Sequence, residues 1–87
     1  MPISTEQLQQ AAQILTGAAT VRAAATEIRT QLAPLRTLVL DAFDLRSEQP
    51  VMRLPQDRAI YLMATDGHCW SVTAEPDQAS ALVLTGA

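Results

Sequence analysis

A repeat of apolar residues in the middle of the chain is the feature that most constrains its fold. The repeat alternates spacings of four and three residues, which is typical of a helix that packs one face along its whole length. Its members are Val21, Ala25, Ile28, Leu32, Leu35, Val39 and Ala42. The pattern predicts a long amphipathic helix over residues 18–45, with an apolar seam about 33 Å long.

Pro34 lies inside this predicted helix. A proline removes one helical hydrogen bond and disfavours helical angles at the residue before it, here Ala33. Two arrangements remain: one helix kinked near Pro34, or two helices with Pro34 in the first turn of the second. We favour the kinked helix, because the apolar spacing continues unbroken across the proline.

A shorter helix precedes this segment. Ser4 and Gln7 have the spacing of a capping box, in which each side chain accepts from the backbone N–H of the other residue. Apolar residues then follow at helical spacing. The sequence predicts a helix over residues 5–16, ended by Gly17 in a left-handed conformation.

The second half of the chain contains a hairpin signal. Two runs rich in β-forming residues, 59–65 and 68–73, flank Asp66 and Gly67. An Asp-Gly pair between two such runs is typical of a two-residue type I′ turn. We therefore expect a β-hairpin with Thr65 paired to His68.

This register assigns the side chains of the hairpin to two faces. One face carries the large residues, with Met63 opposite Trp70 and Tyr61 opposite Val72. The other face carries smaller side chains. Because both faces are partly apolar, we expect the helices to cover one and the chain's tail or a partner to cover the other.

Two further segments complete the predicted fold. Residues 51–54 form a short edge strand ended by Pro55, and residues 77–85 form either a short helix or another strand. The prediction is a single α+β domain over residues 1–87. Its two N-terminal helices, the second long and kinked near Pro34, pack on a small antiparallel sheet.

Charge and cysteine content exclude several classes of function. The 87 residues include nine Asp or Glu against six Arg and no Lys, for a net charge of −3, so we expect no nucleic-acid binding. No apolar run is long enough to span a membrane, and the N-terminus lacks a secretory signal pattern. With Cys69 as the single cysteine, we expect a cytoplasmic protein.

Neither catalytic nor metal-binding patterns are found. His68 and Cys69 are the only residues of their types, and as strand neighbours they point to opposite faces, so we expect Cys69 to be a packed side chain. Asp41, Asp44 and Glu48 form an acidic group without the glycine of a calcium loop. We expect no enzyme activity, no catalytic residues, no cofactor and no metal.

Three arginines lie seven residues apart beside the apolar repeat. They are Arg22, Arg29 and Arg36, at the position whose charges select a partner helix. They form either a solvated edge of the helix or a recognition surface for a partner or an anion.

The sequence therefore favours a non-catalytic protein–protein interaction module that forms a homodimer or binds another protein. Inhibitor, antitoxin-like and assembly roles all fit. The long helix and the aromatic hairpin face provide the predicted interface: Val21, Arg22, Ile28, Arg29, Leu32, Leu35, Arg36, Tyr61, Met63 and Trp70. The alternative is a small-anion or small-molecule binding domain with a pocket between sheet and helices. Met63, Trp70 and Leu32 would line that pocket, and Arg29 or Arg36 would hold the anion.

Overall fold

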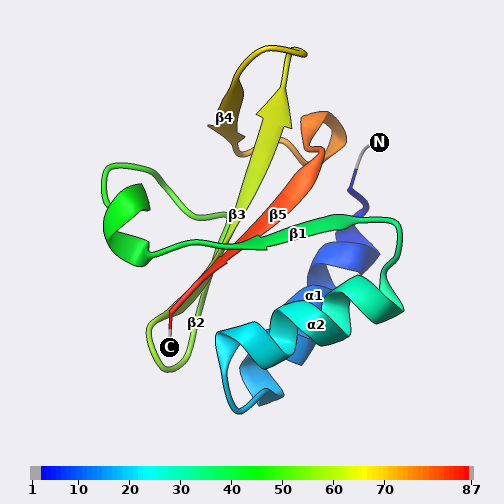
Figure 1. The fold of residues 1–87 in the computed structure, drawn as a ribbon, viewed down its shortest axis with the longest axis vertical. Coiled ribbons are helices and arrows are strands. Elements are labelled where there is room, and N and C mark those ends of the chain that lie inside the picture. The colour runs from blue at the N-terminus through cyan, green and yellow to red at the C-terminus, as the bar shows by residue number, and fades with distance from the viewer. Residues whose placement is uncertain (1–2, 87) are drawn as a thin grey trace.

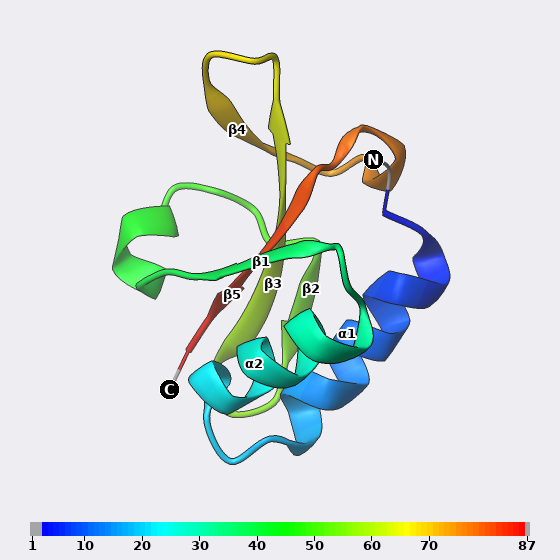
Figure 2. The same ribbon diagram turned by 45° about the vertical axis from the view of Figure 1, so that its right-hand side comes forward.

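The computed structural model describes residues 3–86, which form two layers. Helices α1 (Thr5–Gly17) and α2 (Val21–Gln31) lie together against one face of a five-stranded sheet (Figures 1 and 2). The predicted α+β class is confirmed.

The sheet is mixed, whereas the sequence analysis predicted an antiparallel one. Its strands run in the order β1-β5-β3-β2, and β4 pairs with the C-terminal half of β3. β1 is parallel to β5, and the other pairs are antiparallel. The strands are β1 (Arg36–Val39), β2 (Met52–Leu54), β3 (Arg58–Thr65), β4 (Trp70–Thr73) and β5 (Ala81–Thr85), with short 3₁₀ helices η1 (Ala42–Leu45) and η2 (Pro76–Gln78).

The C-terminal segment is a strand and not a helix. β5 lies between β1 and β3, and every residue from Ala81 to Thr85 is buried. A strand covered on both faces has a continuous apolar run without alternation. For this reason its sequence also fitted a short helix.

The predicted long kinked helix is wrong, and so is its two-helix alternative. α2 ends at Gln31, Leu32 is its C-cap, and the chain turns at Pro34 into β1. Residues four apart share a face in a helix and in a strand alike. Leu35, just before β1, and Val39, within β1, therefore continued the helical spacing although neither is helical.

The apolar seam of α2 is covered by the chain itself. Val21, Ala25, Ile28 and Leu32 are buried against α1 and against the side chains that β3 and β5 direct toward the helices. Val21, Ile28 and Leu32, which the sequence placed in a partner interface, are therefore internal.

The start of α1 is as predicted, and its end is not. Ser4 Oγ accepts from the Gln7 backbone N–H at 3.0 Å, and Gln7 Oε1 accepts from the Ser4 N–H at 2.9 Å. Gly17 is the last helical residue and has no positive φ, and Ala18 after it is extended.

Arg58, the first residue of β3, provides the missing cap at the end of α1. Its side chain is only 3% exposed. Nη1 donates to the carbonyls of Leu15 at 2.6 Å and Ala18 at 2.7 Å, and Nη2 donates to that of Ala19 at 3.0 Å. A guanidinium at a helix C-terminus also interacts favourably with the helix dipole. Arg58 thereby fixes the helical layer to the sheet.

The hairpin forms with a different register from the predicted one. Thr65 pairs with Trp70 and Met63 with Val72, so four residues and not two form the loop. Asp66 explains the wider loop, because its Oδ1 accepts from the N–H groups of His68 and Cys69 at 2.9 and 3.0 Å. The shift is two residues, so the predicted assignment of side chains to faces still holds.

Replacing Arg58 tests its capping role. We expect Arg58→Met to lower the free energy of unfolding by about 3 kcal/mol, because carbonyl groups at the buried end of α1 lose charged donors. Urea denaturation measures the loss. Arg53→Met, at an exposed position of β2, is the matched control and should change stability by less than about 0.5 kcal/mol. Equal effects of the two substitutions would contradict the role.

Two glycines make a second matched pair. Gly86 has φ +123°, and a Cβ there would lie 2.9 Å from Arg58 Cγ and 3.2 Å from the Asp57 carbonyl oxygen. We expect Gly86→Ala to destabilise the protein by about 2 kcal/mol. A Cβ at Gly17 meets nothing within 4 Å, so Gly17→Ala should stabilise the helix by about 0.5–1 kcal/mol. Thermal unfolding of both variants checks the opposite signs.

Candidate interaction surface

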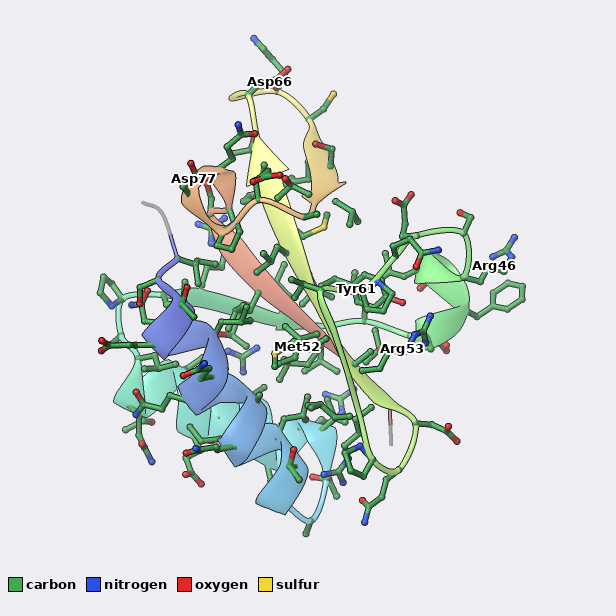
Figure 3. The ribbon with its side chains drawn as sticks, turned by 180° about the vertical axis from the view of Figure 1, so that it is seen from behind. Arg46, Met52, Arg53, Tyr61, Asp66 and Asp77 are labelled. Atoms are coloured by element: carbon green, nitrogen blue, oxygen red, sulfur yellow. The ribbon has the colours of Figure 1, made fainter. Side chains whose placement is uncertain are left out.

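The sheet face turned away from the helices is only partly covered. Leu45 of η1 packs there with Ala59, Tyr61 and Val83 in a second, smaller apolar cluster. Tyr61 is buried between β3 and η1 (Figure 3). The connector between β1 and β2 therefore covers this part of the face, a role that we had expected of the tail or of a partner.

Beyond this cluster, large apolar side chains remain exposed. Among residues 3–86 they are Leu38, Leu40, Phe43 and Trp70, with exposed fractions of 39%, 37%, 66% and 43%. Leu38 alternates with buried Thr37 on β1 and so points away from the helices. The four follow β1 and its immediate neighbours.

Two of the exposed rings are stacked on arginines. The guanidinium carbon of Arg36 lies 5.6 Å from the ring centre of Trp70, and that of Arg46 lies 4.0 Å from the ring centre of Phe43. Arg46 also donates to the Phe43 carbonyl at 2.8 Å. Stacking of this kind holds both partners in place. We call these two pairs, together with Leu38 and Leu40, the outer strip.

The three arginines that the sequence placed on one stripe are separated in the structure. Arg29 donates from Nε and Nη2 to the Thr37 carbonyl at 3.0 and 2.8 Å, which ties α2 to β1. Arg22 is exposed at the start of α2. Arg36 lies on β1 and stacks on Trp70. They do not form one recognition surface, because the helix that would have aligned them ends at Gln31.

The contact of Arg29 also affects the free edge of the sheet. The Leu40 N–H donates to the Leu84 carbonyl. The backbone N–H and C=O groups of even-numbered residues in this segment therefore point toward β5, and those of odd-numbered residues, including Thr37, point away from the sheet at its edge. The two N–H donors of Arg29 thus bind the Thr37 carbonyl, which points away from β5 at the free edge of β1. This contact hinders edge-to-edge pairing through β1.

Most of the predicted apolar interface is internal. Val21, Ile28, Leu32 and Tyr61 are buried, and half-buried Leu35 packs against the core beneath the helices. Met63 is half-buried beside the smaller cluster.

Only Arg36 and Trp70 of the predicted interface residues belong to the outer strip. Sequence analysis missed Leu38, Leu40, Phe43 and Arg46. A strand interpretation of residues 35–40 would have placed Leu38 on the face opposite buried Thr37.

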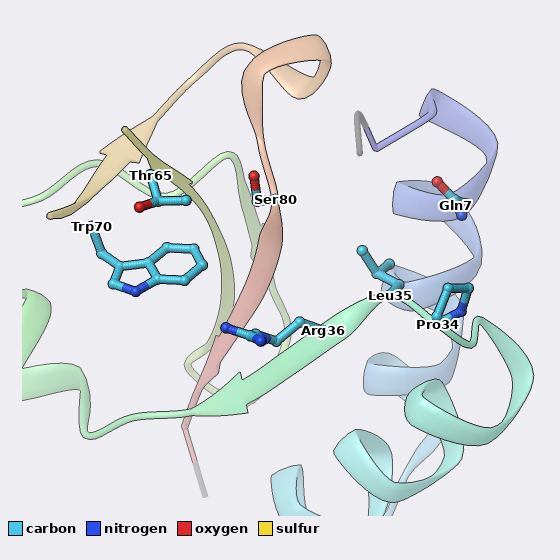
Figure 4. Close-up of a pocket in the computed structure, with 7 residues that line it drawn as sticks. All are labelled: Gln7, Pro34, Leu35, Arg36, Thr65, Trp70 and Ser80. Carbon is cyan, nitrogen blue, oxygen red and sulfur yellow. The ribbon is translucent and has the colours of Figure 1, made fainter. Parts of the chain in front are cut away.

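A cleft of about 360 Å³ opens at the Trp70 end of the strip. Trp70 and Arg36 point toward one another across the space between β4 and β1, and the other lining residues are Gln7, Pro34, Leu35, Thr65 and Ser80 (Figure 4). Of the residues predicted to form a pocket between sheet and helices, Trp70 and Arg36 line this cleft, whereas Met63, Leu32 and Arg29 do not. Leu32 is buried beneath the helices, and the guanidinium of Arg29 is engaged by Thr37.

The polar residues at the hairpin tip lie at the surface of the protein. His68 and Cys69 are both exposed. Cys69 was expected to be packed, but the wider loop places it outside the strand pairing. Within residues 3–86, no three His, Cys, Asp or Glu side chains are grouped as metal ligands. In the same range, no helix has both the length and the apolar character needed to cross a membrane.

The loop does change the acidity of Asp66. Hydrogen bonds from the backbone N–H groups of Cys69 and His68 stabilise the carboxylate and lower the pKa of Asp66 below its ordinary value. Asp66 lies at the far end of the hairpin (Figure 3). Its charge therefore serves to hold the loop.

The lowered pKa of Asp66 predicts a pH-dependent loop. A carboxyl group with a depressed folded-state pKa stabilises the fold above its unfolded pKa, and that contribution is lost as the pH falls through the folded value. We expect the carboxyl carbon resonance of Asp66 to titrate at lower pH in the folded chain than in urea. The amide resonances of His68 and Cys69 should move with the same midpoint. A folded midpoint at or above the unfolded one would contradict the loop geometry.

Comparison of the chain with protein-family models, with curated protein sequences and with solved structures finds no match in any of the three. The function is therefore argued from the geometry of this chain.

Proposed function

We propose that the protein is a non-catalytic protein–protein interaction module that acts through the outer strip and pairs first with a second copy of itself. The observation that carries the proposal is the position of the exposed large apolar side chains. Among residues 3–86 the four are Leu38 on β1, Leu40 and Phe43 in the segment that follows it, and Trp70 on β4, which contacts Arg36 of β1. A continuous exposed apolar surface with polar surroundings is typical of a binding site.

The composition of the strip supports this proposal. Aromatic and arginine side chains dominate the binding energy of interfaces. Aromatic rings bury a large area for few flexible bonds. Trp70 and Phe43 are already held by Arg36 and Arg46. Little conformational freedom is then lost when a partner covers the rings.

Charge favours a second copy as the first partner. Arg36 lies at one end of the strip. At the Phe43 end, Asp41, Asp44 and Glu48 lie within five residues of Arg46 in the chain, which gives this segment a net charge of −2 from three acids and one arginine. Two copies that meet antiparallel across a twofold axis bring the basic end of each to the acidic end of the other. A closed symmetric dimer needs such self-complementarity.

The arginine contacts argue against nucleic-acid binding. Arg29, Arg46 and Arg58 donate to backbone carbonyls within the chain. Few cations remain for phosphate groups on a chain with net charge −3. The proposal also places the protein in the cytoplasm, because a single exposed thiol suits a reducing compartment. Inhibitor, antitoxin-like and assembly roles are all compatible with such a module.

Sedimentation equilibrium over a wide protein concentration range tests the pairing. We expect a monomer–dimer equilibrium for the native chain and a shift to monomer for Leu38→Arg, which places a charge at the centre of the strip. Gln9→Arg adds the same charge at an exposed position of α1 and should leave the equilibrium unchanged. A native chain of 9.4 kDa at every concentration, or equal effects of both variants, would contradict the proposal.

A further inference from the structure

The cleft beside Trp70 has the properties of a small-ligand site, and it shares Trp70 and Arg36 with the outer strip. Its volume of about 360 Å³ lies at the small end of the range for ligand pockets, about 300–1,000 Å³. α1 contributes Gln7, the turn before β1 contributes Pro34, and Ser80 precedes β5 (Figure 4). Segments distant in sequence therefore converge on one concave site.

The charged side chain that lines the cleft is positive. Arg36 lines it, and no Asp or Glu is among the lining residues, although the chain carries nine acids. Three other arginines, Arg29, Arg46 and Arg58, donate N–H groups to backbone carbonyls of the chain. The guanidinium carbon of Arg36 instead lies 5.6 Å from the ring centre of Trp70, within the range of a cation–π contact. Such a contact uses none of the guanidinium N–H groups as hydrogen-bond donors, so they remain available to a ligand.

The remaining lining supplies an apolar wall and further polar groups. Trp70, Pro34 and Leu35 provide the apolar surface. Gln7 uses its Oε1 in the capping box, so its amide NH₂ remains a donor at the rim. The Thr65 hydroxyl accepts from the Gly67 N–H and keeps its own proton to donate.

We infer that this cleft binds a carboxylate carried next to a flat apolar group. The two carboxylate oxygens accept a pair of parallel hydrogen bonds from the N–H groups of the Arg36 guanidinium. The apolar group lies against Trp70 and Leu35. A ligand of about ten non-hydrogen atoms fits the volume of the cleft.

This ligand chemistry has two sources: a free small acid, or the terminal carboxylate of a polypeptide. Phenylacetate is a suitable probe for the first. A short peptide that ends in Leu-Phe with a free carboxylate is a probe for the second, and the same peptide with an amide end is its control. The inference does not depend on the outer strip, because a monomer already contains the whole cleft.

Fluorescence of Trp70, the only tryptophan of the chain, reports binding directly. We expect phenylacetate to change the emission saturably, with a dissociation constant on the order of 1 mM. Neutral phenylacetamide should bind at least about tenfold more weakly, since it lacks the charge that Arg36 recognises. The tighter of the two carboxylate probes identifies the source.

Substitutions separate the charge of Arg36 from general effects. Arg36→Gln should weaken phenylacetate binding at least about tenfold, and Arg36→Lys should bind with intermediate affinity, because it keeps the charge without the fork. Arg22→Gln removes one exposed charge from α2 and should bind as the native chain does. Because Arg36→Gln also alters the emission of the free protein, shifts of the indole and Gln7 amide resonances provide a second measurement.

Equal binding of phenylacetate and phenylacetamide, or unchanged binding by Arg36→Gln, would overturn the inference. The same titration on Leu38→Arg distinguishes it from the proposed pairing. Retained probe binding by a monomeric Leu38→Arg chain shows that the cleft acts without the partner. Failure of the probe with the native chain overturns the cleft site and leaves the result of sedimentation unaffected.

Discussion

The contact between the Arg58 guanidinium and the end of α1 holds the two layers of this protein together. A buried cation is stable only when strong acceptors surround it, and here the acceptors are three backbone carbonyls that a helix end leaves without partners. The same contact sets where α1 stops and where β3 begins. Gly86 must be a glycine beside it, since a Cβ there would meet Arg58.

Covering one face of the sheet with helices determines what the other face can do. The inward-pointing apolar side chains of α2, β3 and β5 are buried against one another within the chain. On the opposite face, within residues 3–86, the short η1 connector provides the cover, and it packs on the sheet through Leu45. The outer strip and the cleft lie where that cover ends. The proposed partner surface therefore depends on the incomplete cover of the second face, and not on a helix left without a neighbour.

Arginine contributes to this structure mainly through its geometry. Arg29 and Arg58 make forked contacts with carbonyl groups, and Arg36 and Arg46 stack on aromatic rings. A lysine offers neither a planar fork nor a stacking face. The absence of lysine from this chain thus agrees with the positions that its cations occupy. Arg36 belongs to the outer strip and also lines the cleft, so both proposals involve it.

Short-range interactions made part of the fold readable from sequence alone: the capping box at Ser4, the edge strand before Pro55 and the two faces of the hairpin each depend on residues a few positions apart. Tertiary structure decided the rest. The helical spacing across Pro34 was ambiguous because residues four apart share a face in both helix and strand. Only the parallel pairing of β1 with β5 resolves it. Arg58 reaches a carbonyl 43 residues away, and the outer strip depends on which face η1 covers, so neither leaves a local pattern.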